Sequence, residues 1–321
     1  MSNDNILERL ESQINRLEEL GQQNGLDLSD EIERLTKKLV EAKEEHREAL
    51  SDWDRVKLAR HPNRPTFMDY LGLLMDDFYE LHGDRLLGDD KALVGGLAKF
   101  QGRSVVVIGQ QKGCDAEESK SCNFGMVRPE GYRKACRLMD LADRFSFPLI
   151  TFIDTPGAYP GKDSERHNIG GTIARSISRM AKLEVPTIAT VIGEGGSGGA
   201  VAIGVADRVL MLENSIYSVI SPEGCAAILW KDKEEADRAA SSLKLTPPDL
   251  FEMDLIDEII EEGPDGAHEN FEVTATNLKA SLMHNLDELV EKDPLDLREK
   301  RLARYSRMGS FREIQEESAE Q

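Results

Sequence analysis

The spacing of apolar residues predicts two long helices at the start of the chain. Leucines and isoleucines recur three and four positions apart over 7–17, the pattern lapses over 21–25, and it resumes over 32–56. Each helix has one narrow apolar stripe and a charged outer face. Because two such helices cannot bury both stripes alone, we expect an antiparallel pair that also lies on another surface, either as a cap on this chain or as an arm for a partner.

Two prolines end this helical region. Pro62 and Pro65 interrupt the pattern, and Thr66 with Asp69 forms an N-cap signal for a helix that we expect to continue through Tyr79. The globular part of the chain should therefore begin at about residue 60.

Beyond this point, strand-like and helix-like segments alternate. Segments 92–100 and 103–110 read as a hairpin, a polar loop follows over 112–128, and Pro129 opens a helix. The inward face of that helix is expected to carry Tyr132, Ala135, Cys136, Met139, Ala142 and Phe145. Next come strand 148–154, loop 155–168, helix 170–183, strand 186–192 and strand 208–212. Such alternation indicates parallel strands with helical crossovers, and hence an α/β domain.

The last hundred residues carry shorter signals. They predict a helix opened by Pro222, an acidic helix at 232–243, a turn at 246–249, a strand at 256–260, helices at Phe271–Glu291 and Leu295–Met308, and a frayed tail. The predicted division is a helical arm at 1–60, a catalytic-type α/β domain at 61–268, and C-terminal helices with a tail at 269–321.

The most distinctive stretch follows the apolar strand Thr187–Ile192, where five glycines fall within seven residues: Gly193, Gly195, Gly196, Gly198 and Gly199. Glycines this dense before a helix leave backbone N–H groups uncovered near the positive end of that helix, which is a site suited to an anion. The alternative is that they only let strand and helix pack closely.

Three motifs overlap this region or imitate it. Segment 193–198 matches the dinucleotide fingerprint GxGxxG, but the helix after it is short for a crossover. Segment 195–199 matches the nucleophile elbow GxSxG around Ser197, yet no downstream histidine clearly follows an acidic triad member. The DTPG segment at 154–157 imitates a GTPase switch but lacks a preceding phosphate loop.

Composition narrows the class of protein. The chain has 321 residues, 40% of them hydrophobic, and a formal net charge of −20, which argues against nucleic acid as a general partner. It has no leader-like start and no apolar run of membrane-spanning length, so we expect a cytoplasmic protein without a membrane partner. The four cysteines show no CxxC spacing, so no metal site is expected in this chain.

Longer strings carry a more specific resemblance. In this order along the chain, GGLA, IGQQKG, NFGM, PEGYRKA, ITFIDTPGAYPG, VIGEGGSGGA, AIGVADRV and YSVISPEGCAAILW, over about 58–268, closely resemble the α subunit of the acetyl-CoA carboxylase carboxyltransferase of bacteria and plastids. The resemblance implies a crotonase-like fold, a spiral of ββα units. It also implies transfer of a carboxyl group from carboxybiotin to acetyl-CoA, which gives malonyl-CoA for fatty acid synthesis.

The same resemblance implies where the chemistry occurs. The reaction leaves negative charge on two oxygens, one on biotin and one on the thioester, so it needs two oxyanion holes but neither a metal nor an activated nucleophile. The biotin hole maps onto the backbone N–H groups of Gly198 and Gly199. The residues implied to bind carboxybiotin are Gly195, Gly196, Pro156, Gly157, Phe124 and Gly125.

The implied partners supply the rest of the reaction. A β subunit, expected in an α2β2 heterotetramer, would hold acetyl-CoA and the zinc. Carboxybiotin would arrive on a biotin carboxyl carrier protein, with no cofactor bound covalently here, and biotin carboxylase would belong to the larger ATP-binding complex. The rival interpretations are a non-catalytic or divergent paralogue of the same fold and, further off, an NAD-dependent oxidoreductase.

Two segments depart from the family pattern. Between QKG and NFGM the family carries several basic residues, whereas segment 114–122 is CDAEESKSC with Lys120 as its only basic residue. In 165–174, Gly170 and Gly171 replace expected helix formers. Both changes lie near the implied site, so they bear on which carrier protein and which acyl-CoA the chain recognises.

Overall fold

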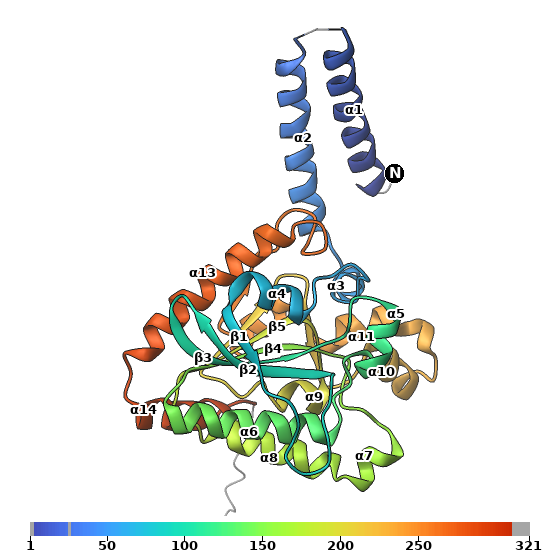
Figure 1. Cartoon of the computed structure of the whole chain (residues 1–321). Helices are drawn as coiled ribbons and strands as arrows, with labels where there is room; N and C mark the ends of the chain where they lie inside the picture. Colours follow the sequence, from blue (N-terminus) through green and yellow to red (C-terminus); the bar gives the residue numbers. More distant parts are fainter. Residues whose placement is uncertain (1–2, 25–26, 310–321) are drawn as a thin grey trace, which may run out of the picture.

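The computed structural model describes residues 3–24 and 27–309. These residues form a mixed sheet with helices on both faces and a helical arm that rises from it (Figure 1). The strands are β1 (Asp76–Glu80), β2 (Leu93–Phe100), β3 (Arg103–Gln110), β4 (Leu149–Thr155), β5 (Thr187–Gly196), β6 (Arg208–Leu212), β7 (Ile216–Ser218) and β8 (Glu258–Ile260). Their order is β1-β2-β3-β4-β5-β6-β8, with β7 paired to β5. The predicted α/β class is confirmed.

The helices alternate with these strands. The α-helices before β4 are α1 (Asn3–Asn24), α2 (Ser29–Glu48), α3 (Asp52–Ala59), α4 (Phe67–Leu74), α5 (Ala116–Ser121) and α6 (Pro129–Phe145). Those after it are α7 (Lys162–Arg166), α8 (Ile169–Ala181), α9 (Ser197–Val201), α10 (Pro222–Leu229), α11 (Ala236–Leu243), α12 (Pro247–Glu252), α13 (Phe271–Val290) and α14 (Pro294–Ser306). Two 3-10 turns, η1 (Asn123–Gly125) and η2 (Lys233–Glu235), complete the described elements.

The β2–β3 hairpin matches the prediction in its strands and its turn. Gln101 and Gly102 both have positive φ, 50° and 78°, as in the tight turns whose twist suits a hairpin. From β3 onward the strands β3, β4, β5, β6 and β8 are parallel. Their carboxyl ends therefore meet at one edge of the sheet, which is where the glycine stretch lies.

One predicted helix was too long. Helix α4 has the expected capping box between Thr66 and Asp69, but it ends at Leu74, and the chain continuing to Tyr79 forms β1, which pairs antiparallel with β2. The helix ends because Met75, its C-cap, already has an extended backbone, with φ of −117° and ψ of 143°, which leads the chain into β1.

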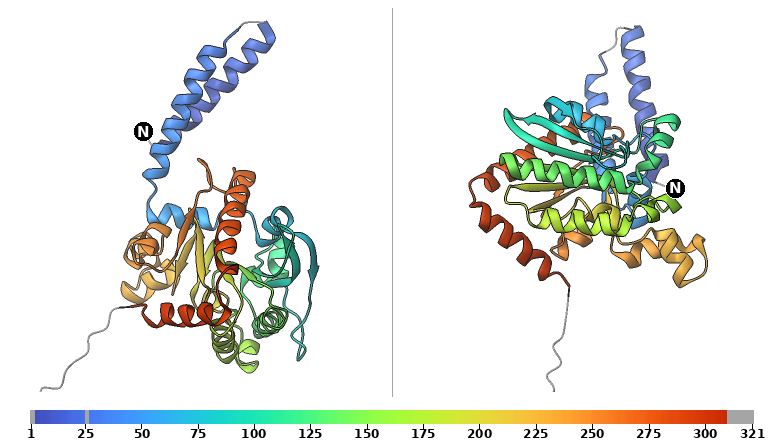
Figure 2. Two further views of the ribbon diagram at one scale, coloured as in Figure 1. Left: turned by 90° about the vertical axis from the view of Figure 1, so that its left-hand side faces the viewer. Right: turned by 60° about the horizontal axis from the view of Figure 1, so that its bottom comes forward.

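The sheet lies between two helical layers (Figure 2). Helices α6 and α8 cover one face, where Val106 and Ile108 of β3 are buried, and α4 and α13 cover the other, where Val105 and Val107 are buried. The predicted inward face of α6 is confirmed apart from Phe145. That side chain is 58% exposed because it is the last residue of the helix and its ring stacks on Phe147 instead.

The arm is an antiparallel helix pair, as predicted (Figures 1 and 2). Its second apolar pattern is not one helix through Val56, however, because α2 ends at Glu48 and Ser51 caps a separate helix, α3. In α3, Val56 and Ala59 are buried against Ile216 of the sheet. The predicted three-part division stays a prediction, but α3, which it assigned to the arm, packs on the body, and α13, which it assigned to the C-terminal part, packs on the sheet.

Several predicted loops contain short helices. The polar loop at 112–128 holds α5 and η1, the loop at 155–168 holds α7, and the predicted turn at 246–249 is the start of α12. The last correction has a simple cause, since prolines are tolerated in the first turn of a helix, where their missing N–H is not needed. The tail predicted to be frayed lies outside the described residues beyond 309.

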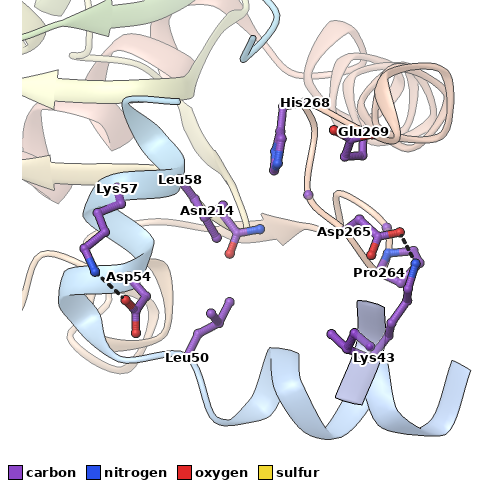
Figure 3. A pocket seen from close by; sticks show the side chains of 13 residues that line it. Lys43, Leu50, Asp54, Lys57, Leu58, Asn214, Pro264, Asp265, His268 and Glu269 are labelled. Carbon is purple, nitrogen blue, oxygen red and sulfur yellow. Dashed lines mark hydrogen bonds and ion pairs between the residues drawn. The ribbon is translucent and has the colours of Figure 1, made fainter. Parts of the chain in front are cut away.

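A cavity of about 660 Å³ separates the arm from the body (Figure 3). Lys43 of α2 pairs with Asp265 of the body across 2.8 Å on one side of it, and Leu50 and His268 also line it. None of the residues predicted to bind carboxybiotin lines this cavity. Among the described helices, none combines the length and the apolar character needed to cross a bilayer.

Deleting residues 1–48 tests the predicted role of the arm in assembly. The truncated chain keeps Ser51 and α3, so it should still melt cooperatively. We expect light scattering to report a smaller oligomer than for the full chain. An unchanged oligomeric state would contradict the prediction, and deletion of 1–60, which also removes α3, serves as the destabilised comparison.

Candidate functional site

The glycine stretch does not begin as a turn. Strand β5 continues through Gly196, beyond the predicted end at Ile192, because its last residues pair with Thr155 of β4 on one side and with β7 on the other. Only Gly198 and Gly199 of the five glycines lie in the short helix α9. The first three glycines therefore serve an extended strand held between two neighbours.

Close contacts with other parts of the chain explain three of these glycines. A Cβ at Gly196 would lie 2.3 Å from the carbonyl of Pro156, and one at Gly199 would lie 2.8 Å from the nitrogen of Ala158. At Gly195 it would meet the ring of Tyr217 at 2.7 Å. The close-packing interpretation therefore holds at these three positions.

Gly198 differs from its neighbours. A Cβ there would lie 3.7 Å from the nearest atom, in Ile173, which is an ordinary contact. Packing alone therefore does not require glycine at 198. The residue before it, Ser197, has a φ of 50°, so the chain turns sharply between β5 and α9. The first N–H groups of α9 follow this turn and have no carbonyl partner within the helix.

Helix α9 is five residues long, so its dipole is small and the individual N–H groups matter more than the macrodipole. One of its carbonyl groups, and three carbonyl groups just after it, accept hydrogen bonds from side chains of surrounding elements. The donor and acceptor pairs are Gln110 Nε2 to Gly199 O (2.8 Å), Ser176 Oγ to Ala202 O (2.6 Å), Thr151 Oγ1 to Ile203 O (2.7 Å) and Tyr305 OH to Gly204 O (3.0 Å).

The loop that follows β4 packs on top of this helix. Thr155, which is fully buried, joins that loop to the NFGM segment, because its hydroxyl lies 2.7 Å from Gly125 O and 2.8 Å from Gly157 O and accepts from Gly157 N. Gly157 has a φ of 148°, a conformation that other residues rarely adopt. Pro156, Gly157 and Gly125 are thereby brought against the glycine stretch.

Phe124 lies apart from that group. Its side chain is 57% exposed, and it lines a separate cavity of about 330 Å³ beside Lys112 and Cys114. The structure therefore brings Gly195, Gly196, Gly198 and Gly199 together with Pro156, Gly157 and Gly125, while the ring of Phe124 faces another hollow.

An apolar cavity of about 600 Å³ opens beside Gly198. Ser197 and Gly198 form part of its wall, and the other residues that line it include Tyr217, Leu243, Met253 and Tyr305. The described residues that line it include no histidine, so Ser197 has no base there although its backbone resembles a nucleophile elbow. The dinucleotide fingerprint does not fit either, because its first glycines lie within a strand and α9 is too short.

Behind the glycine strand lies a chain of alternating charges that the sequence analysis missed. Lys112 Nζ is 2.7 Å from Asp154 Oδ1 and 2.8 Å from Glu194 Oε2, and Glu194 Oε1 accepts from Arg60 Nε at 2.7 Å. Arg60 also pairs with Glu223. The signal available in the sequence was the polar residues at the ends of β3, β4 and β5, since parallel strand ends share one edge.

The charges in this network stabilise one another. Burial alone would raise the pKa of Glu194, but Lys112 and Arg60 lower it from its ordinary value. Burial alone would lower the pKa of Lys112, but Asp154 and Glu194 raise it. Glu194 and Lys112 are therefore both ionised at neutral pH. Among the described residues no cluster of three or more histidine, cysteine, aspartate and glutamate side chains is arranged to hold a metal ion.

Comparison with known proteins identifies what this arrangement resembles. A family described as acetyl co-enzyme A carboxylase carboxyltransferase-like matches residues 1–309. The acetyl-coenzyme A carboxylase carboxyl transferase subunit alpha from a strain of Thermus thermophilus is 51% identical over 94% of this chain and 96% of its own length. The subunit of the same name from Geobacter metallireducens is 52% identical over 95% of each chain.

Solved structures support the fold. A transcarboxylase 12S structure has a TM-score of 0.54 and 21% identity, and the match covers 70% of this chain and 44% of that one. A Pseudomonas malonate decarboxylase hetero-tetramer in complex with coenzyme A has a TM-score of 0.55 and 17% identity, with 68% and 89% covered. The predicted crotonase-like fold, which these carboxyltransferases share, is confirmed.

Glu194→Gln tests the charge network. The variant removes the negative charge that faces Lys112 and Arg60. At about pH 7 we therefore expect its free energy of unfolding to be about 3 kcal/mol lower than that of wild type. Because the folded pKa of Glu194 is lowered, its stabilisation is complete above its ordinary value of 4.5 and is lost as the pH falls through the folded value. In urea titrations the difference from wild type should therefore shrink as the pH is lowered below 4.5, and a constant difference would contradict the assignment.

Proposed function

This chain belongs to the acetyl-CoA carboxylase carboxyltransferase α-subunit family, and we propose that it supplies the carboxybiotin half of that enzyme's active site. It is a biotin-dependent carboxyltransferase that transfers a carboxyl group to acetyl-CoA for fatty acid synthesis. The observation that carries this conclusion is the identity of about half the residues over nearly the full length of both chains. The geometry around Gly198 supports the proposed placement of the chemistry.

Carboxybiotin would supply carbon dioxide, and the ureido group that remains would carry negative charge on its oxygen. We assign the N–H groups of Gly198 and Gly199 as the donors for that oxygen. Both belong to the first turn of α9, where helical partners are absent. Backbone donors held by a rigid surrounding structure stabilise such a charge without reorganising during the reaction.

The surroundings of these donors fit an uncharged ring. The cavity of about 600 Å³ beside Gly198 is lined mainly by apolar side chains, which suits the sulfur-containing bicycle of biotin and its alkyl chain better than a phosphate or a carboxylate. Gly195 and Gly196 would bind carboxybiotin from the end of β5, and Pro156, Gly157 and Gly125 from the loop segments packed against it. Phe124 is the assigned residue with the weakest geometric support, because it lines a different cavity.

The remaining parts of the reaction belong to partners. The family name places this chain in a complex with a β subunit, and we propose that the β subunit holds acetyl-CoA, its oxyanion hole and the zinc in an α2β2 assembly. The proposed further partners are a biotin carboxyl carrier protein and a biotin carboxylase, with a cytoplasmic location. Reconstitution with the β subunit and carrier of the same source distinguishes this enzyme from a non-catalytic paralogue, which would bind them without forming malonyl-CoA.

Ser197→Ala and Gly198→Val distinguish backbone from side-chain catalysis. If main-chain donors act, Ser197→Ala should keep most of the malonyl-CoA formation. Gly198→Val places a branched side chain beside the donors, and loss of one such donor typically lowers kcat by about 100- to 1,000-fold. Acetyl-CoA binding by the complex should barely change.

Gly198 is the informative position because the fold has room for a Cβ there, whereas a side chain at Gly199 would collide with the backbone at Ala158. Gly198→Ala serves as the graded control, with an intermediate loss of kcat. An inactive Ser197→Ala variant in a correctly assembled complex would overturn the oxyanion assignment.

Glu117→Lys tests the proposal that the acidic loop at 114–122 selects a basic surface on the carrier or the β subunit. Asp115 caps α5 and Glu118 binds the N–H of Cys114, so Glu117 is the exposed acid whose replacement leaves the loop intact. We expect the variant to use the cognate carrier less well, and the wild-type rate to fall as salt rises. Rates that are equal for wild type, Glu117→Lys and Glu117→Gln at every ionic strength would show that the loop is only solvated surface.

A further inference from the structure

The side chain of Gln110 connects helix α9, which carries the proposed oxyanion donors, to Asp154 of the charge network through hydrogen bonds. Gln110 is the last residue of β3 and has no exposed surface. Its Nε2 donates to Gly199 O at 2.8 Å, and its Oε1 accepts from Asp154 N at 3.1 Å. A single buried amide therefore spans the ends of β3 and β4 and reaches the first turn of α9.

The geometry points to Gln110 as a positioning residue for carboxyl transfer, and this inference rests on the proposed function of Gly198 and Gly199. Gln110 is not among the residues that line the cavity beside Gly198. It therefore acts through its hydrogen bond to the backbone of Gly199. By fixing the carbonyl of that residue, it fixes the rotation of the first turn of α9, whose N–H groups are the proposed donors.

Both ends of the Gln110 amide are restrained, which sets its orientation. The backbone N–H of Asp154 donates to the amide oxygen of Gln110. The Oδ1 atom of Asp154 in turn accepts from Glu194 N at 2.9 Å and lies 2.7 Å from Lys112 Nζ. The amide oxygen must therefore face Asp154, and the amide nitrogen must face Gly199 O. Of the side chains that hold carbonyls of this segment, Gln110 acts nearest the proposed donors, since the others bind at 202, 203 and 204.

A carboxyl group at position 110 gives a test that general destabilisation would not reproduce. In Gln110→Glu, the neutral acid can still accept from Asp154 N and donate its proton to Gly199 O, whereas the carboxylate can only accept and would repel that carbonyl. Burial raises the pKa of a carboxyl group. The variant should therefore be active when protonated and lose activity as the pH rises, relative to wild type.

The measurement is the pH profile of malonyl-CoA formation by the reconstituted complex of this chain, the β subunit and the carrier. We expect the ratio of the kcat of Gln110→Glu to the kcat of wild type to fall by about 10-fold or more between low and high pH. The KM for acetyl-CoA should not change. Gln110→Met, which cannot donate at any pH, should show a similar loss of kcat without the pH dependence.

Thr151→Val is the matched control. It removes an equally buried hydrogen bond to the same segment, at Ile203 O, so it should lower the melting temperature while leaving kcat within about threefold of wild type. Parallel pH profiles for Gln110→Glu and wild type would overturn the inference, as would a Thr151→Val loss as large as that of Gln110→Met. A wild-type complex that forms no malonyl-CoA would instead reject the proposed function itself.

Discussion

The backbone of a very short helix buried beside the sheet edge is the constraint on which the site depends. Helix α9 has five residues, so almost none of its carbonyl and N–H groups can pair within it. Side chains of β3, α8, β4 and α14 donate to the carbonyls of residues 199, 202, 203 and 204. The carbonyls of residues 198, 200 and 201 accept from backbone N–H groups at 202, 203 and 204. The first N–H groups of a helix have no carbonyl partner within it, and the oxyanion hole proposed at Gly198 and Gly199 rests on this property.

The second constraint is electrostatic. The chain carries a net charge of −20, yet behind the glycine strand its acids alternate with Lys112 and Arg60, so each of these carboxylates has a cation within hydrogen-bond distance. Such pairs add little net stability against apolar replacements, but removing one member is costly because a partly buried charge then lacks its partner. Their consequence here is geometric, since they hold the ends of β3, β4 and β5 in one arrangement.

A similar pairing fastens the C-terminal helix to the body. Arg301 of α14 is almost fully buried, pairs with Asp207 at 2.6 Å, and donates to the carbonyls of Met180 and Leu183 at the end of α8. The helix that carries Tyr305 to Gly204 is therefore held at two points. A helix near the C-terminal end of the described chain thus contacts the segment that follows the glycines.

The sequence by itself determined the class of the fold, the hairpin, the helix pair of the arm and the family, because these depend on local periodicity and on long matching strings such as ITFIDTPGAYPG. It also indicated the glycine stretch. It did not show that β5 runs on to Gly196, that α4 ends at Leu74, or that Phe124 lines a separate cavity. Above all, it could not distinguish the glycines that packing requires from Gly198, because that distinction depends on backbone segments far apart in the chain coming within van der Waals contact. Tertiary structure alone decided this, and it alone brought Gln110, Lys112, Asp154 and Glu194 to one edge of the sheet.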